Sequence, residues 1–335
     1  MARYLVAASL MISAVACDHS EPFSPVAGES GPFAPLPERL TFNSRHDSLN
    51  GYTSDGSELF YTYCEDIKTD ATPPCGEFNQ PDALTVPADR CLGALPVAGG
   101  SRVVERCGNS AADRDSLKIY RSGTRLADGS LVFAYDSRRT SASFSIDPAL
   151  YVLRPGALSP VRLLSYTPNV YDLLIPSRIL AAGGQQVVTL GGAGPELITV
   201  HDDNTVTRVA IPPLVALDPA AGIGLTRSDD NLFRVSLPNG AAQLFASIPQ
   251  EGDWAGATTS GIGYAAGRAL VAQSRTYLVG TTTFQEGRLV MLEGDAGLTE
   301  VVRAANLTIG QVVVSPDGKF VAVERGGDLY RYALP

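Results

Sequence analysis

The feature that most constrains how this chain can fold is an internal repeat. Residues 218–235 align without a gap on residues 315–332 at a constant offset of 97 residues, so that Pro219 falls on Pro316. A further copy lies between them, at Ala265–Ala272, which halves the period to about 48 residues. A period of this length indicates supersecondary units that become stable only when they stack on one another.

The repeated pattern is a tight turn followed by a short β-rich run. Runs such as Ser130–Tyr135 are separated by Gly, Asp-Gly or Asn turns, as in antiparallel hairpins, and no helical periodicity follows residue 37. Six copies are found, with anchors at Gly56, Gly129, Gly183, Ala221, Gly267 and Gly318. A period of about 40–50 residues with four strands per unit predicts an all-β fold of the β-propeller type. We expect six blades, with seven as the alternative.

One copy of the repeat carries a family resemblance. Ser315–Val323, with the sequence SPDGKFVAV, resembles the SPDG-type repeat of the TolB-like, WD40-like periplasmic propellers. In the other copies the Ser-Pro pair is mostly replaced. The resemblance implies architecture and no activity, because the motif specifies a turn and an inner strand. TolB itself carries an additional N-terminal domain, for which residues 18–37 are too short, so its role in an envelope complex is not implied.

The last repeat contains too few strands to form a complete blade. It supplies Gln311–Ser315, Phe320–Glu324 and Leu329–Leu334, and a fourth strand is missing. Glu38–Asn43 is β-like and precedes the first repeat. We therefore expect this N-terminal strand to pair with the last repeat, which would cover an open sheet edge and close the ring.

The N-terminal sequence is typical of an export signal. Arg3 precedes an apolar run that is shorter than the ~20 residues of a membrane-spanning helix, and the small residues Ala14–Ala16 lead to Cys17. This pattern resembles the lipobox of bacterial lipoproteins, which implies removal of residues 1–16 and a diacylglycerol on Cys17. Ala14 departs from the Leu that the family prefers. An ordinary signal peptide that is cleaved nearby is the alternative.

A proline-rich tether follows the predicted lipid anchor. Residues 17–37 contain five prolines together with Gly and Ser, a composition that stays extended and does not fold. The propeller is then expected over residues 38–335. We expect a protein of the bacterial cell envelope, periplasm-facing or at the surface, attached to a membrane by lipid alone. Asp18 resembles the inner-membrane retention signal of enteric lipoproteins, but the choice between inner and outer membrane stays open.

Four further cysteines lie close together, at Cys64, Cys75, Cys91 and Cys107. An even number in one segment of an exported protein indicates two disulfides, and we interpret residues 64–107 as a disulfide-bearing insertion. A zinc site is the alternative, but the spacing lacks two close pairs. We favour the pairs Cys64–Cys75 and Cys91–Cys107. A hairpin centred on Gly99 would place the second pair face to face.

Charge and composition exclude several kinds of site. Without Arg3 the chain has 25 basic and 35 acidic residues, which disfavours binding of nucleic acid or of an anionic membrane surface. Residues 201–204 (His-Asp-Asp-Asn) are interpreted as a hairpin turn, His46 as a loop residue, and His19 lies in the tether. The Asp-Gly pairs are interpreted as repeat turns, and no GxSxG motif occurs. We expect no catalytic residue, metal site or cofactor.

Two functional hypotheses remain after these exclusions. The favoured one is a monomeric binding or scaffold module for an envelope protein, a glycan or a small molecule. The alternative is a six-bladed enzyme of the metal-dependent lactonase or sugar-dehydrogenase kind, which would require acidic, Asn or His side chains to converge on the axis. The expected binding rim lies around Glu65 to Arg90. Trp254 is a second candidate, either as an exposed stacking residue or as a packing residue between blades.

Overall fold

The part of the chain that the structure describes has an all-β fold. The computed structural model describes residues 37–41, 47–64, 90–99, 101–107, 116–139, 148–166, 176–191, 194–294 and 297–335. Within these ranges the regular elements are β-strands, apart from short 3₁₀ turns such as η2 (Gly252–Trp254). No helix in the described ranges has the length and apolarity needed to cross a bilayer. The predicted signal sequence, Cys17 and nearly all of the tether lie outside the described residues.

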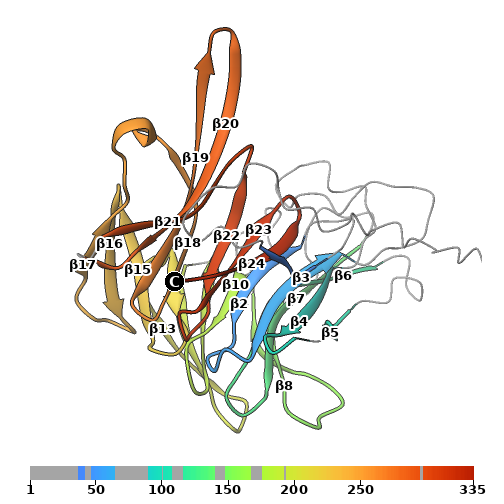
Figure 1. The fold of residues 1–335 in the computed structure, drawn as a ribbon. Helices are drawn as coiled ribbons and strands as arrows, with labels where there is room; N and C mark the ends of the chain where they lie inside the picture. The colour runs from blue at the N-terminus through green and yellow to red at the C-terminus, as the bar shows by residue number, and fades with distance from the viewer. Residues whose placement is uncertain are drawn as a thin grey trace, which may run out of the picture.

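Four of the sheets contain four strands each (Figure 1). One combines the N-terminal strand β1 (Glu38–Arg39) with β24 (Asp328–Ala333), β23 (Phe320–Arg325) and β22 (Ile309–Val314). The other three follow chain order: β10 (Pro176–Ala181), β11 (Gln186–Gly191), β12 (Glu196–Val200) and β13 (Val206–Ala210); β14 (Ala216–Asp218), β15 (Ile223–Ser228), β16 (Asn231–Ser236) and β17 (Gln243–Ser247); β18 (Thr258–Ala265), β19 (Arg268–Val279), β20 (Thr282–Leu292) and β21 (Leu298–Ala305).

The fifth sheet has eight strands. Its path runs through β2 (Ser48–Tyr52), β3 (Glu58–Cys64), β4 (Arg90–Pro96), β6 (Ser116–Arg125), β7 (Leu131–Arg139), β8 (Ala149–Leu153) and β9 (Val161–Ser165), with β5 (Val103–Arg106) paired to β4. The two halves of this sheet meet between β4 and β6 in one parallel residue pair, Arg90 with Ile119. All other strand pairs within the sheet are antiparallel.

The sheets are arranged as in a β-propeller. The first strands of five units, β2, β10, β14, β18 and β22, together line one small cavity of about 20 Å³ on a common axis. Neighbouring sheets pack face to face around this axis. The prediction of an all-β, propeller-like fold built from small antiparallel sheets is therefore confirmed.

The six repeat anchors occupy equivalent turns. Each lies between the first and second strand of a unit, and five of them are glycines with φ between 70° and 87°. In the fourth unit the glycine with positive φ is Gly222, one residue after the predicted anchor Ala221. In this turn the Asp218 carboxylate accepts the backbone N–H groups of both Ala220 and Ala221.

The Asp-Gly pairs form turns, as predicted. The Asp55 carboxylate accepts hydrogen bonds from the Ser57 backbone N–H and hydroxyl at 3.0 and 2.8 Å. Asp317 accepts the Lys319 N–H at 3.1 Å in the same way. Aspartate commonly bonds to the backbone two residues ahead, so these contacts fix the turn locally.

The N-terminal strand completes the last sheet, as predicted from the strand count. β1 pairs antiparallel with β24, and Glu38 lies opposite Arg331. Arg39 forms an ion pair of 2.6 Å with Asp328. The Thr41 hydroxyl oxygen accepts the Leu329 N–H at 2.9 Å, and this pair is buried. Residues 42 and 43 of the predicted strand lie outside the described residues.

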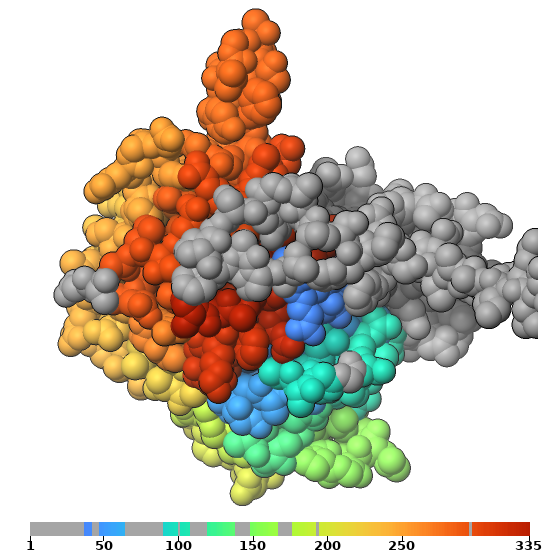
Figure 2. All heavy atoms as spheres, in the orientation of Figure 1, coloured from blue at the N-terminus to red at the C-terminus, as the bar shows by residue number. Residues whose placement is uncertain are grey.

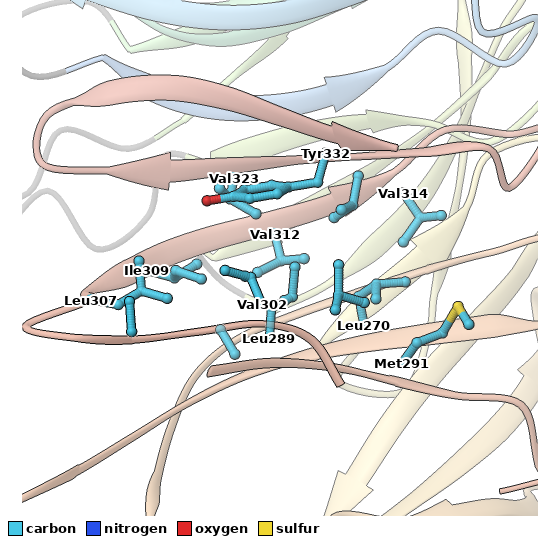
Figure 3. Packing of buried hydrophobic residues seen from close by; sticks show 14 of the residues in the cluster. Leu270, Leu289, Met291, Val302, Leu307, Ile309, Val312, Val314, Val323 and Tyr332 are labelled. Carbon is cyan, nitrogen blue, oxygen red and sulfur yellow. The ribbon is translucent and has the colours of Figure 1, made fainter. Parts of the chain in front are cut away.

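The hydrophobic core lies between neighbouring sheets. The largest cluster joins the sheet of β18–β21 to the sheet of β22–β24 and contains Leu270, Leu289, Val312 and Tyr332 (Figure 3). Alternate residues of β19 face two different clusters, because this sheet is covered on both sides. The inner strands approach very closely: a Cβ atom on Gly261 would lie 2.1 Å from the Gly310 carbonyl oxygen. Only glycine fits at this contact.

Candidate functional site

A long hairpin projects from one face of the molecule. β19 and β20 extend beyond their sheet and form the orange arm in Figures 1 and 2. The pairing of β18 with β19 ends at Ser274, and that of β20 with β21 ends at Glu286. Beyond these points the described strand pairs join β19 and β20 only to each other, as far as Val279 with Thr282. We call residues 275–286 the arm.

The tip of the arm is uncharged and partly apolar. No residue between Arg275 and Glu286 carries a charge. Tyr277 and Phe284 are cross-strand partners whose stacked rings have centroids 5.8 Å apart. Leu278 is 70% exposed, and Val279, Tyr277 and Phe284 are also exposed. A soluble surface rarely holds several large apolar side chains together unless they bind something.

The base of the arm rests on a tryptophan held among arginines. Trp254 is 4% exposed, and the guanidinium carbons of Arg288, Arg275 and Arg303 lie 4.0, 4.8 and 5.5 Å from its ring centroid. Arg288 donates to the Gln273 side-chain oxygen at 2.9 and 2.7 Å. Burial lowers the pKa of Arg288 to about 10, which still leaves it charged at neutral pH. These contacts fix the indole between cationic groups.

Glu286 connects two of these arginines. It forms ion pairs with Arg303 at 2.6 Å and Arg275 at 2.7 Å. The hydrogen bond from Arg303 is the main cause that lowers the pKa of the Glu286 carboxyl, with Arg275 adding to it. Arg275 also lies 5.0 Å from the ring centroid of Tyr277. A continuous ladder of Trp254, Arg275, Tyr277 and Phe284 therefore links the body to the tip of the arm.

The structure places the predicted rim residues in different surroundings. Trp254 is packed and not exposed, so the packing role is the one that its contacts show. Glu65 lies outside the described residues. Arg90 begins β4 at the junction of the eight-stranded sheet and is half-buried. Burial, followed by the nearby charge of Arg121, lowers the pKa of Arg90 to about 10.

One of the two expected disulfides is present. Cys91 and Cys107 are joined with a Cα–Cα distance of 4.3 Å. Leu92 lies opposite Arg106 in the hairpin of β4 and β5, the register expected for a turn centred on Gly99. The bond therefore closes a hairpin of the eight-stranded sheet. The Cys64 side chain and Cys75 fall outside the described residues, so their pairing stays a prediction.

The histidine segment forms a turn, as predicted. His201 Nε2 lies 2.8 Å from the Thr207 hydroxyl, and the Asp203 carboxylate accepts the Thr205 N–H at 3.0 Å. In the described part of the chain, no three His, Cys, Asp or Glu residues are grouped as metal ligands. Among the described residues that line the axial cavity, Arg178 is the one charged side chain. His19 and His46 lie outside the described residues.

Comparison with known proteins adds little to this description. No family model matches the chain, and no curated protein matches it. Among solved structures, a chain from the "Crystal Structure of Mitotic Checkpoint Complex" matches all of this chain and 99% of its own length, at 10% identity and a TM-score of 0.42. A likeness this weak carries no functional argument. The sheets themselves define the class of the protein, which is a β-propeller-like, all-β repeat protein.

Proposed function

We propose that this protein is a lipid-anchored binding or scaffold module of the cell envelope, which contacts a partner protein through the arm. The observation that carries the proposal is the uncharged tip between Arg275 and Glu286, which exposes Tyr277, Leu278, Val279 and Phe284 beyond the body of the molecule. A projecting surface of this kind suits a large partner better than a small ligand, which is normally enclosed in a concave pocket.

The edges of the arm suggest how the partner binds. Natural proteins usually protect an open strand edge with charges, proline or a bulge. Residues 276–284 contain no charged residue and no proline, and their pairing in β19 and β20 is regular. An extended, uncharged segment of a partner could add to either edge by backbone hydrogen bonds while its side chains pack on Leu278 or on the stacked rings of Tyr277 and Phe284. An uncharged tip also avoids repulsion between this acidic chain and another acidic protein.

We also propose that the ring has six blades. This count is supported by the single residue pair between β4 and β6, which divides the eight-stranded sheet into two units, β2–β5 and β6–β9. Each of these units has its own repeat turn, at Gly56 and Gly129. With the four four-stranded sheets they make six repeats, and seven would require a unit without a repeat anchor.

Attachment to the envelope rests on the sequence. We propose that residues 1–16 are removed, that Cys17 is lipidated, and that residues 17–37 tether a monomeric propeller of residues 38–335 to the membrane. Labelled palmitate should enter the full-length protein in cells, and the substitution Cys17→Ser should abolish the labelling. Labelling that survives the substitution would contradict the lipobox interpretation.

Residues 65–90 remain a second proposed contact. Loops on a rigid scaffold are where recognition residues usually gather, and this segment connects two strands of the eight-stranded sheet. No observation on the described residues favours the lactonase or sugar-dehydrogenase alternative over binding.

Site-specific photo-cross-linking in intact cells tests the role of the arm. A photoreactive residue replaces Leu278, and the matched control replaces Leu158, an exposed leucine (98%) in the turn between β8 and β9. We expect position 278 to trap one discrete protein and position 158 to trap none. Adding Leu278→Asp to a probe at position 277 should reduce the yield at least fivefold. Equal trapping at positions 278 and 158 would refute the proposed contact. A third probe at position 78 covers residues 65–90, and trapping at that position alone would move the contact there.

A further inference from the structure

An arginine lines the cavity on the propeller axis. Arg178 is the third residue of β10, before that strand runs toward its repeat turn. The charged group that acts on Arg178 is the carboxylate of Glu324 in β23, which also acts on Arg90 in β4.

The carboxylate of Glu324 already has partners. Its two oxygens accept the backbone N–H groups of Leu49 and Gln311, at 2.5 and 3.3 Å.

Arg178 and Asn50 are left with unused donors. Arg178 Nη2 donates to the Asn50 carbonyl oxygen at 2.8 Å. Arg178 Nε and Asn50 Nδ2 are both buried and have no acceptor among the described residues, and Asn50 is only 2% exposed. Burial lowers the pKa of Arg178 to about 10. A buried donor without an acceptor costs about 1–3 kcal/mol, and more when it is charged. The two donors belong to residues in direct contact, so an acceptor that reaches both would remove this cost.

Arg178 also lines the axial cavity. The other side chains around that space are mainly apolar, among them Leu180, Ile262 and Val312. Its volume of about 20 Å³ leaves room for one or two water-sized groups. Coulomb attraction to the guanidinium is strong in such apolar surroundings. The space therefore suits the head of a small anion and excludes a bulky one.

We infer that Arg178 and Asn50 form a binding site for a small anion, a halide or a carboxylate head group, on the propeller axis. The site is separate from the arm and does not depend on it. It also differs from the expectation that this acidic chain disfavours anionic partners, because the one charged side chain among the described residues that line the cavity is a cation.

Titration of the purified protein with sodium chloride and, separately, with sodium acetate tests the site. Ionic strength is held constant with sodium isethionate, whose sulfonate is bulky. We expect one of the two anions to bind with 1:1 stoichiometry by calorimetry and to raise the melting temperature in a saturable way. Arg178→Met should weaken this binding at least tenfold. The matched control, Arg208→Met in the same sheet, removes an exposed arginine paired with Glu196 and should leave binding unchanged.

The result for the wild-type protein is decisive even if Arg178→Met fails to fold. Saturable binding of chloride alone would identify a halide site, and binding of acetate alone a carboxylate site. Asn50→Ala, which keeps the guanidinium of Arg178, should weaken binding of the same anion. No saturable binding of either anion would overturn the inference and leave water as the occupant of the cavity. Equal binding by the Arg178→Met and Arg208→Met variants would overturn it as well.

Discussion

The two ends of the β19–β20 hairpin show the same kind of sequence in opposite surroundings. In the lower part, Ala269–Ala272 are completely buried, with one sheet on each side. In the upper part, Tyr277–Val279 have the same apolar, β-prone character and are exposed. The difference lies in whether β18 and β21 continue alongside. An apolar strand becomes core when it has neighbours and a candidate contact surface when it has none.

The sharpest test of this comparison removes whole strands. Deleting residues 38–43 removes β1 with its pairing to β24 and the Arg39–Asp328 ion pair, and exposes the apolar faces beneath. We expect a fall in melting temperature of more than about 10 °C. The deletion should lower the free energy of unfolding by several kcal/mol, and each kcal/mol lowers the melting temperature by about 2–4 °C in a large domain. Deleting residues 18–36, or replacing residues 276–285 by Asn-Gly, should change it by less than about 3 °C. Thermal melts monitored by circular dichroism decide this. Equal losses for the deletions of 38–43 and 18–36 would mean that β1 does not close the ring.

A pair of leucine substitutions makes the same comparison within one hairpin. Leu270→Ala leaves a cavity between two sheets and should cost about 2–5 kcal/mol of unfolding free energy. Leu278→Ala, at an exposed position, should change it by less than about 0.5 kcal/mol. Urea denaturation measures both. A large cost at Leu278 would show that the arm packs against something in the free protein.

The smallest expected effect concerns the link between arm and body. Because the folded protein holds the pKa of Glu286 below its usual value of 4.5, its ion pairs stabilise the arm above that pH and are lost as the pH falls through the lower folded value. Trp254 is the single tryptophan, so its fluorescence reports on the ladder directly. We expect a change in emission below pH 4.5 in the wild-type protein, and no such step in Glu286→Gln. A step of the same size in that variant would assign it to another carboxylate.

Much of the fold could be predicted because its signals are local. Each repeat turn is determined by five or six consecutive residues, which include an aspartate that accepts a backbone N–H two residues ahead and a glycine with positive φ. The repeat turns could therefore be predicted from the sequence. The partner of β1 followed from counting strands. The register at Cys91–Cys107 followed from the symmetry of a hairpin about Gly99. In each case the prediction needed only residues close together in the sequence or the number of strands in a repeat.

The arm and the axial site could not be predicted in the same way. Tyr277–Val279 resembles any buried strand, and only the lengths of β18 and β21 decide that it is exposed. The surroundings of Trp254 are built from Arg275, Arg288 and Arg303, which converge from three strands. Arg178 lies in a β-rich segment that has no distinguishing sequence feature. Its contact with Asn50 and its donor without an acceptor depend on how the strands pack. The parallel contact of Arg90 with Ile119 likewise depends on tertiary packing.

The pairing of β1 with β24 has a consequence for how the protein acquires its structure. Arg39 and its partner Asp328 are 289 residues apart in the chain, so a ribosome completes nearly the whole sequence between making one and the other. Closing so long a loop carries an entropic cost that local hairpins avoid, and contacts between distant residues form slowly. The individual sheets can therefore form in order during synthesis, while the edge of β24 stays open until β1 returns to it. That interval is when the chain is most exposed to pairing with the wrong strand.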